Sequence, residues 1–569
     1  MESIIDYYAD PTSGSWAEIG YDPFPLGVPG EIPEVEAPPS RDLDAVDDYY
    51  DFVIVGSGAG GGVAAYVLAS AGATVLVVER GRWLGRAEIP VDHIRNHRVF
   101  FGGDLTSPPG HPRAVPGNGG ETAVDVDDVR YQHNAITVGG GTRVFGAQAW
   151  RFHPDDFRMA SLYGVPEGSA LADWPIGYDD LEPYYDRVEW ELGVCGSPHD
   201  GDPPRRREYP MAPFEKGPWG KRLARAANGL GWATGPVPML INSLPHQGRP
   251  ACVRCGFCVG FPCPVEAKNG TYNTVLPKAF DLGAHAIFTA QAIGISDTGE
   301  VEIASGKGTR TIRCGRVVLA GGAVETARLL LLSGLGNDWV GDCLQGHTYT
   351  LAGGTFDEVV TDCVGPGPST ATRVFSHGNE NVIGGGMLAD DFVKIPLMFY
   401  LMGLAPDVDR NDPDIKRIMA QNYLRTGQVM GPVQEIPTRR ARVRLATSVT
   451  DACGVKVARL EGEQHPEDLR TAAFMADRAE EWIRATGATR TWQLAPTTPC
   501  LSASQHQAGT VRMSDQPDHG ATDPFGAVWG CERIIVADSS VHVTNGGVNP
   551  VLTIMALAWR TAEHAASKG

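Results

Sequence analysis

Short apolar runs separated by glycine turns mark the chain from residue 50 onward. The segment YDFVIVGSGAGGGVAAYVLASAGATVLVVERG contains an apolar strand at Phe52 to Val55, a glycine turn, a helix of small and apolar residues, and a second apolar strand at Val75 to Val78. Strands that are apolar at every position are typical of a parallel sheet that is covered on both faces. The pattern therefore predicts a β-α-β unit of a buried parallel sheet.

The same pattern of strand, glycine turn and helix returns from Arg316 to Gly334, in RVVLAGGAVETARLLLLSG. Alternating segments predict a small antiparallel sheet over residues 286–320 and a larger one over 341–460. A helix is predicted over 178–194, and an amphipathic helix over 466–486. Together these elements predict an α/β fold, α+β overall, in which a Rossmann-like domain is combined with a domain built on an antiparallel sheet.

The first glycine turn has the spacing of a dinucleotide-binding loop. Gly56-x-Gly58-x-x-Gly61 lies between a buried strand and a helix, and Glu79 ends the next strand. We expect Gly56 to allow the tight turn, Gly58 to let a pyrophosphate approach the backbone, and Gly61 to let helix and strand pack closely. Glu79 can accept a hydrogen bond from a ribose 2′-hydroxyl, which disfavours NADP. The motif alone leaves FAD and NAD open.

Composition and charge exclude some classes of function. The 569 residues carry 68 acidic and 48 basic side chains, a formal charge of −20, which argues against nucleic acid as a partner because phosphates require a basic surface. The first residues, MESIIDYYADPTSGSW, lack the basic and apolar segments of a secretory signal. No apolar run is long enough to predict a membrane span. We therefore expect a cytoplasmic protein.

Two short motifs stand near the end of the chain, H-x-x-G-T at His506 to Thr510 and N-P at Asn549-Pro550. Together with the N-terminal glycine motif, they resemble the glucose–methanol–choline (GMC) family of oxidoreductases, which combines such a glycine motif with a C-terminal H-x-x-G-T and a distant N-P or H-P. Two further segments are similar to family blocks, VGGGTRVFGAQAWR at 138–151 and WPIGYDDLEPYY at 174–185. The resemblance covers the chain apart from its first residues and is weakest between 341 and 440.

The chemistry of alcohol oxidation assigns roles to these residues. A flavin removes a hydride from carbon while the hydroxyl loses a proton, so the site needs a base beside the flavin N5, and a neutral histidine with an ordinary pKa of about 6.5 suits this task. We expect His506 to be that base and Asn549 to hydrogen-bond the substrate oxygen. Pro550 suits the start of a helix, from about Val551 to His564, whose positive end would face the flavin.

The resemblance also implies a cofactor, FAD, and the division of the chain. The expected FAD contacts are the N-terminal glycines and Glu79, together with Gly140, Gly141, Thr142, Asp538, Asn549 and Pro550. Residues 1–48, rich in Pro, Gly, Asp and Glu, are expected to form a surface arm. The FAD-binding domain is expected to consist of 49–160, 286–340 and 500–569, interleaved with a substrate-binding domain of 161–285 and 341–499.

The expected reaction is FAD-dependent oxidation of a CH–OH group of a polar, sugar-like molecule or glycoside to the carbonyl. Two alternatives stay open, oxidation of an aminoglycoside hydroxyl and a non-redox lyase reaction on the same scaffold. The electron acceptor would be oxygen, a dye-like molecule or a redox partner protein, and a small partner subunit is compatible with the resemblance.

Four cysteines crowd into ACVRCGFCVGFPCP, a loop of the expected substrate-binding domain at residues 251–264. The spacing Cys252-x2-Cys255-x2-Cys258-x4-Cys263-Pro is close to the C-x2-C-x2-C-x3-C-P spacing of ferredoxins. Structural zinc sites usually draw ligand pairs from separated segments, and disulfides between such close neighbours are strained. The spacing leaves open an iron–sulfur cluster held by the four cysteines, plain thiols or a disulfide that fixes the loop, and a zinc ion.

Overall fold

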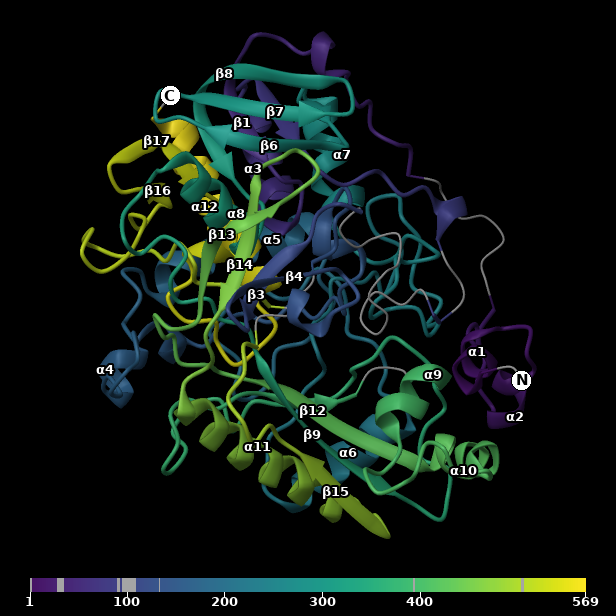
Figure 1. Cartoon of the computed structure of the whole chain (residues 1–569). Coiled ribbons are helices and arrows are strands. Elements are labelled where there is room, and N and C mark those ends of the chain that lie inside the picture. Colours follow the sequence, from purple (N-terminus) through teal and green to yellow (C-terminus); the bar gives the residue numbers. More distant parts are fainter. Residues whose placement is uncertain are drawn as a thin grey trace.

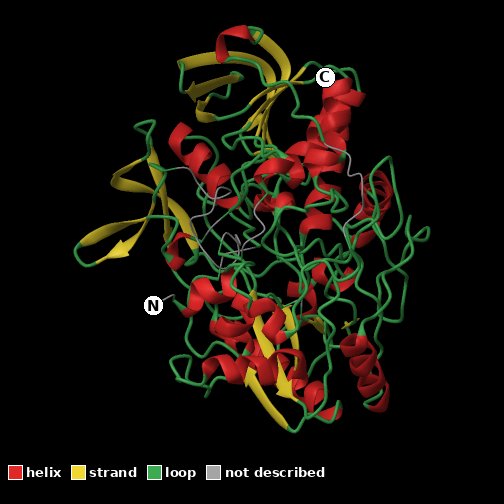
Figure 2. Cartoon of the chain, turned by 90° about the vertical axis from the view of Figure 1, so that its right-hand side faces the viewer, coloured by secondary structure: helices red, strands yellow, loops and turns green. Residues whose placement is uncertain are grey.

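The computed structural model describes residues 3–27, 35–89, 93–94, 109–132, 134–391, 394–502 and 506–568. Within these residues the chain forms three β-sheets, which follow one another along the molecule in Figure 1. Figure 2, turned by a quarter, shows that loops fill much of the middle of the molecule between the sheets. None of the helices in the described ranges is both long and apolar enough to cross a membrane.

The first sheet is the predicted parallel sheet. Its strands follow the order β16-β17-β8-β1-β2-β5, and the pairs from β17 to β5 are parallel. The bounds are β1 Tyr49–Val55, β2 Val75–Val78, β5 His285–Ile287, β8 Gly308–Leu319, β16 Ala527–Val528 and β17 Cys531–Val536. All four side chains of β2 are buried, as the apolar pattern predicts. Helix α3 (Ala59–Ser70) packs on β1 and β2 and against the C-terminal helix α12 (Val551–Ser567).

The small antiparallel sheet predicted over 286–320 is an extension of this first sheet. Strands β6 (Ala290–Ile295) and β7 (Glu300–Ser305) pair antiparallel, and β7 pairs with the first half of β8. The second half of β8 pairs with β1. Because β8 is 12 residues long, it takes part in both arrangements and joins them into one sheet.

The larger antiparallel sheet predicted over 341–460 is divided between two sheets in the structure. One has the order β10-β11-β12-β9-β15, and the other has the order β13-β14-β3-β4. The bounds are β3 Arg113–Gly117, β4 Gly120–Val124, β9 Thr348–Thr355, β10 Ala371–Thr372, β11 Leu388–Asp390, β12 Thr426–Val433, β13 Arg442–Thr450, β14 Lys456–Glu461 and β15 Arg490–Leu494. The hairpin β13–β14 leaves the larger sheet because β14 pairs with β3, which is distant in sequence.

Helices lie beside the sheets and within the N-terminal segment. The two predicted helices are α5 (Tyr178–Leu192) and the amphipathic α11 (Pro466–Ala485), and α11 packs on the five-stranded sheet. The others are α1 Ile4–Ala9, α2 Ser15–Ile19, α4 Met159–Tyr163, α6 Pro218–Gly229, α7 Val275–Asp281, α8 Ala323–Ser333, α9 Pro396–Met398 and α10 Ile415–Asn422. The α/β fold with a Rossmann-like domain and an antiparallel domain is confirmed.

The N-terminal segment is anchored by aromatic side chains. Tyr8, Trp16 and Tyr21 are buried in a hydrophobic cluster that also contains Phe399 and Tyr423. The segment therefore packs with residues near 395–423, next to α9 and α10, where Figure 1 shows α1 and α2.

Candidate active site

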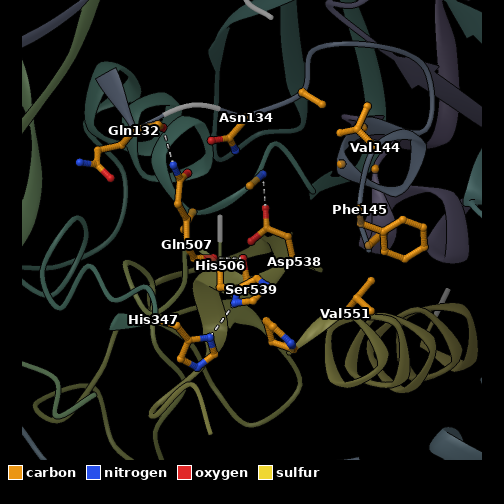
Figure 3. A pocket seen from close by; sticks show the side chains of 18 of the residues that line it. Gln132, Asn134, Val144, Phe145, His347, His506, Gln507, Asp538, Ser539 and Val551 are labelled. Atoms are coloured by element: carbon orange, nitrogen blue, oxygen red, sulfur yellow. Dashed lines mark hydrogen bonds between the residues drawn. The ribbon is translucent and has the colours of Figure 1, made fainter. Parts of the chain in front are cut away.

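A cavity of about 1080 Å³ is lined by residues of the parallel sheet and of the five-stranded sheet. Its lining includes the first glycine turn, the segment at 140–148, part of β6, and C-terminal residues from His506 to Ile554. Figure 3 shows its centre, with His506 between His347 on one side and Val551, at the start of α12, on the other. A cavity of this size at the ends of parallel strands is the usual place for a large ligand in such a fold.

Of the three glycines of the first turn, two have no space for a side chain and one borders open space. Gly56 has a φ of +99°, and a Cβ added there would lie 2.4 Å from the carbonyl oxygen of Ala320. A Cβ on Gly61 would lie 2.0 Å from the carbonyl oxygen of Gly56. At Gly58 the nearest atom to an added Cβ is 3.9 Å away. Gly58 therefore leaves space on the cavity side, as a pyrophosphate-binding loop requires.

Glu79 holds this turn in place. Its Oε2 atom accepts hydrogen bonds from the backbone N–H and the hydroxyl of Ser57, at 2.9 and 2.7 Å, and its Oε1 atom accepts one from Gly81 N at 2.7 Å. The side chain is buried, and burial raises its pKa above the usual value. Glu79 lines the cavity, so its contact with a ribose stays a prediction beside this structural role.

The N-terminus of α3 points at the cavity without a side-chain cap. Gly58 is the N-cap residue, it makes no side-chain cap hydrogen bond, and Ala59 and Gly60 line the cavity. The first N–H groups of a helix lack intrahelical partners and carry a partial positive charge, so they favour a phosphate. This end of the cavity suits the anionic part of a dinucleotide.

Gly61 is not among the residues that line the cavity, whereas the other predicted contact residues are. Gly140 approaches the first turn closely, since a Cβ there would lie 2.9 Å from Gly58 Cα, whereas Gly141 has no atom within 4 Å of an added Cβ. The hydroxyl of Thr142 donates to the carbonyl oxygen of Gly139 at 2.6 Å. Asp538 accepts hydrogen bonds from Gly322 N at 2.8 Å and from the hydroxyl of Thr326 at 2.6 Å, so it joins the end of β17 to the second glycine turn. Burial raises the pKa of Asp538.

Several buried oxygen atoms of the cavity lining have no hydrogen-bond partner among the described residues. They are Gln132 Oε1, Asn134 Oδ1, Gln291 Oε1, Gln507 Oε1 and Asn549 Oδ1. An unsatisfied buried acceptor costs about 1–3 kcal/mol, so donors are expected from a bound molecule. FAD carries amino, imide and hydroxyl donors along its whole length. The lining therefore fits this cofactor.

His506 and His347 form the polar centre of the cavity. Their Nδ1 atoms lie 2.7 Å apart, and His347 Nε2 lies 2.7 Å from the carbonyl oxygen of Gly546. His506 Nε2 lies 3.4 Å from Asn549 Nδ2. The two histidines are 159 residues apart in the sequence, so only the folded chain brings them together.

These partners determine which nitrogen atoms carry protons. The carbonyl oxygen of Gly546 can only accept, so His347 must carry its proton on Nε2. Burial lowers the pKa of His347, so this histidine is neutral and its Nδ1 atom is an acceptor. His506 must then donate from Nδ1, and in its neutral form His506 has its lone pair on Nε2. That lone pair is beside Asn549, on the cavity side.

Backbone and side-chain contacts hold the two histidines in position. The Glu435 carboxylate, just after β12, accepts hydrogen bonds from Thr348 N at 2.6 Å and Gly346 N at 3.2 Å, on both sides of His347. The Asn545 amide donates to the backbone carbonyl oxygen of His506 at 2.7 Å and to that of Gly346 at 3.1 Å. Glu435 thus connects the start of β9 with the segment after β12, and Asn545 connects it with the C-terminal segment.

Asn549 and Pro550 form the start of the C-terminal helix. Pro550 is the N-cap residue of α12, one position before the first helical turn, and no side chain caps this helix. Val551 and Ile554 line the cavity. The positive end of α12 therefore faces the cavity, in agreement with the predicted helix start.

The cysteine-rich loop borders the cavity but is not arranged as a metal site. Val259 and Gly260 line the cavity, and Lys268 Nζ holds the loop by donating to the carbonyl oxygens of Cys258 and Phe261, both at 2.7 Å, and of Phe145 at 3.0 Å. In the part of the chain that the structure describes, no three His, Cys, Asp or Glu side chains are grouped to hold a metal ion.

The structure therefore does not support the iron–sulfur or zinc alternatives. It does not support the disulfide alternative either. The cysteines concerned, Cys252, Cys255, Cys258 and Cys263, all lie within the described ranges and are unpaired. Burial raises their pKa values, for Cys258 to about 12, so they are neutral thiols packed into the hydrophobic interior. The loop is held by Lys268 and by this packing.

Sequence reasoning missed several residues of this site. His347, Glu435 and Asn545 carry no local motif that the analysis used, and their roles depend on contacts between distant segments. Gly60 was also missed, although a Cβ there would lie 1.7 Å from the carbonyl oxygen of Ala537. The run Gly60-Gly61-Gly62 at the start of α3 was a signal of close packing on both sides of the helix.

Comparisons with known proteins agree with this geometry. Two family models, both described as GMC oxidoreductase, match residues 50–349 and 437–558. Paromamine 6'-oxidase of Streptomyces fradiae is 30% identical, with 93% of this chain and 94% of that protein covered. The fructose dehydrogenase large subunit of Gluconobacter japonicus is 26% identical, with 90% and 97% covered.

Solved structures of similar fold include two oxidases. Formate oxidase of Aspergillus oryzae, in a study of its FAD modification, has a TM-score of 0.57 at 14% identity, with 92% of this chain and 98% of that chain covered. Pyridoxine 4-oxidase has a TM-score of 0.55 at 16% identity, with 90% and 98% covered. At these identities the likeness concerns the fold.

Proposed function

The chain belongs to the GMC oxidoreductase family, and from this premise we propose that its cavity binds FAD and oxidises a CH–OH group of a sugar-like alcohol or glycoside to the carbonyl. The observation that carries the proposal is the hydrogen bond between the Nδ1 atoms of His506 and His347, from which we infer that the lone pair of neutral His506 lies on Nε2, beside Asn549. A base and a hydrogen-bond donor in this arrangement are what the alcohol oxygen requires.

The residues of this chain would activate the alcohol. His506 Nε2 takes the hydroxyl proton, and Asn549 Nδ2, which lies 3.4 Å from it, donates to the same oxygen and keeps it aligned. Once it has accepted the proton, His506 is positively charged, and its hydrogen bond from Nδ1 to His347 stabilises this charge. FAD, when bound, supplies the acceptor for the hydride that leaves the substrate carbon.

The cofactor would be held along the length of the cavity. The first glycine turn and the uncapped N-terminus of α3 suit the pyrophosphate, and Glu79 suits a ribose hydroxyl. Gly141, which has open space around an added Cβ, would leave room near the ring system, and the positive end of α12 would stabilise negative charge that develops there. The unpaired amide oxygens of the lining supply acceptors for its donors.

The names of the relatives bear on substrate and acceptor. Paromamine 6'-oxidase and 6'''-hydroxyparomomycin C oxidase are aminoglycoside oxidases by name, and fructose dehydrogenase is a sugar dehydrogenase by name. We propose a small sugar-like alcohol as substrate, and oxygen or another electron acceptor for the second half of the reaction. A redox partner or small partner subunit stays a prediction. No observation favours the lyase alternative.

The test is anaerobic reduction of the bound flavin by a panel of sugars and alcohols. His506→Ala is expected to slow reduction by about 10²- to 10⁴-fold because it removes the base, while FAD stays bound. His519→Ala is the matched control, since His519 is an exposed histidine whose side chain is 62% exposed. Unchanged reduction in His506→Ala would overturn the assignment. A substrate that turns over while the flavin stays oxidised would indicate the lyase reaction instead.

A further inference from the structure

The outer part of the cavity, away from the histidines, is apolar. Its wall is formed by side chains of the five-stranded sheet and of the segments after α9 and around β15. The main ones are Leu351, Leu401, Met402, Leu404, Leu494 and Pro496. Because these residues come from three separate segments, the apolar wall is a feature of the folded chain.

Polarity changes along the cavity from the centre to the rim. The polar residues His347, Thr348 and Gln464 are buried, and the amide of Gln464 donates to the hydroxyl of Thr348 at 2.8 Å. By contrast, Met402 is 50% exposed and Leu494 is 47% exposed, although both line the same cavity. Large apolar side chains that remain open to solvent on the rim of a binding cavity indicate an apolar ligand group.

Charged groups in the lining do not suit a cationic substrate. Its carboxylates, among the described residues, are Glu79, Glu325 and Asp538, which all lie with the nucleotide-binding elements. Arg410 lies in the outer part, but its guanidinium donates to the carbonyl oxygens of Leu404, Ala405 and Val408 of its own loop, at 3.0, 2.9 and 2.6 Å. Among the residues that the structure describes, the outer part therefore offers no carboxylate to an ammonium group.

We propose that the outer part of the cavity binds an uncharged apolar substituent of the alcohol, so that the preferred substrates are neutral alcohols or glycosides that carry an alkyl or aryl group. This inference rests on the proposed oxidation at His506, because the reacting carbon must lie beside His506 Nε2 and the rest of the molecule then extends toward the rim. The occupant of the apolar wall is the substrate itself.

The expected effect on binding follows from the burial of hydrocarbon. Each methylene group that moves from water into apolar surroundings contributes about 0.8 kcal/mol, which corresponds to about fourfold in affinity. Affinity should therefore rise by this factor for each added methylene until the chain reaches beyond Met402 and Leu494. Burial of apolar surface should also give a negative heat-capacity change of binding.

Binding can be measured without turnover. Tertiary alcohols have no hydrogen on the carbinol carbon, so they cannot be oxidised, and the series from 2-methylpropan-2-ol to 2-methyloctan-2-ol is titrated into the FAD-loaded protein by calorimetry. We expect Kd to fall about fourfold per methylene at first, with a negative heat-capacity change. An affinity that does not depend on chain length would overturn the inference.

Variants of two wall residues test whether the apolar wall is the source of the gain in affinity per methylene. Met402→Gln and Leu494→Gln are expected to lower the gain per methylene, so that their loss of affinity grows with chain length. Leu244→Gln is the matched control, because Leu244 is 56% exposed and does not line the cavity. If all three variants keep the slope of the unchanged protein, the wall does not bind the substituent.

Reduction of the flavin separates this inference from the proposed function. Anaerobic reduction is measured with methyl to octyl β-D-glucosides, primary alcohols of the same lengths, and paromamine. Values of kcat/KM that rise with chain length, above the value for paromamine, support the inference. Faster reduction by paromamine, or no dependence on chain length, would contradict the apolar subsite and leave the proposed oxidation intact. Tertiary alcohols that bind with the expected slope while no alcohol or sugar reduces the flavin would refute the oxidation and support the apolar subsite.

Discussion

Replacement of His347 by leucine removes the group that accepts the hydrogen bond from His506 Nδ1. The bond is 2.7 Å long, and His347 is buried, so its loss leaves the partly buried donor His506 Nδ1 without this partner. Such a loss is worth about 1–3 kcal/mol, which corresponds to a rate of flavin reduction that is about 5- to 150-fold lower. The reason is that the neutral ring of His506 no longer has its lone pair directed to Nε2.

A conservative variant distinguishes this positioning role from simple damage to the core. In His347→Gln, the amide oxygen can accept from His506 Nδ1 while the amide nitrogen donates to the carbonyl oxygen of Gly546, as His347 Nε2 does. We expect His347→Gln to recover most of the lost rate and His347→Leu to recover none of it. Both variants should keep the KM for the alcohol close to the original value, because His347 acts through His506.

The assay is single-turnover reduction of the FAD-loaded protein in a stopped-flow instrument, as a function of substrate concentration and pH. An acceptor at His506 Nδ1 stabilises the protonated ring, so its loss in His347→Leu should move the acid limb of the kcat/KM profile to lower pH. His347→Gln should keep the original profile. Equal rates and profiles in the two variants, or no loss in His347→Leu, would refute the proton arrangement derived from the hydrogen bonds.

Three further predictions concern stability, the cofactor and the cysteines. Burial lowers the pKa of His542 from 6.5 to about 4, so the folded state favours the neutral ring. The free energy of unfolding should therefore decrease by about 3 kcal/mol because of this group as the pH falls from above 6.5 to 4. Urea unfolding of His542→Asn should show a weaker dependence over this range, and an equal dependence would contradict the assignment. Gly60→Ala should destabilise the apoprotein, because the new Cβ would lie 1.7 Å from the carbonyl oxygen of Ala537. Gly141→Ala should keep the thermal midpoint of the apoprotein and weaken FAD binding. Equal thermal midpoints for the two apoproteins would contradict this packing. Iron and labile sulfide in anaerobically purified protein should be well below one atom per chain, and Cys255→Ser should keep its rate of flavin reduction. Stoichiometric iron would instead support the iron–sulfur cluster.

Local patterns identified the part of the site that is built from contiguous residues. The turn between β1 and α3 could be predicted because its strand, glycines and helix follow one another within one segment, and Gly56 has the positive φ that the tight turn requires. Strand β2 has the predicted bounds, Val75–Val78, because a strand buried on both faces must be apolar at each position. The helix start at Pro550 follows from the fixed φ and the missing N–H of proline.

Contacts between distant segments could not be predicted in the same way. The alternating pattern predicted one larger antiparallel sheet, but the pairing of β14 with β3 places part of it in a separate sheet. Alternation shows which side chains of a strand share a face, and it does not show which other strand lies beside that strand. The cysteine spacing resembled a cluster motif, yet spacing along a loop does not determine where the thiols point, and Lys268 holds the loop instead.

The sequence by itself determined the family and predicted the dinucleotide loop and His506 as the base, because each of these depends on residue types at short and regular spacings. Only the tertiary structure decided that His347 orients His506, that Glu435 and Asn545 hold them, and that an apolar wall lines the outer cavity. The physical reason is that a proton position depends on the partner of the opposite ring nitrogen, and the polarity of a cavity depends on which segments meet there. Both are properties of contacts made across the folded chain.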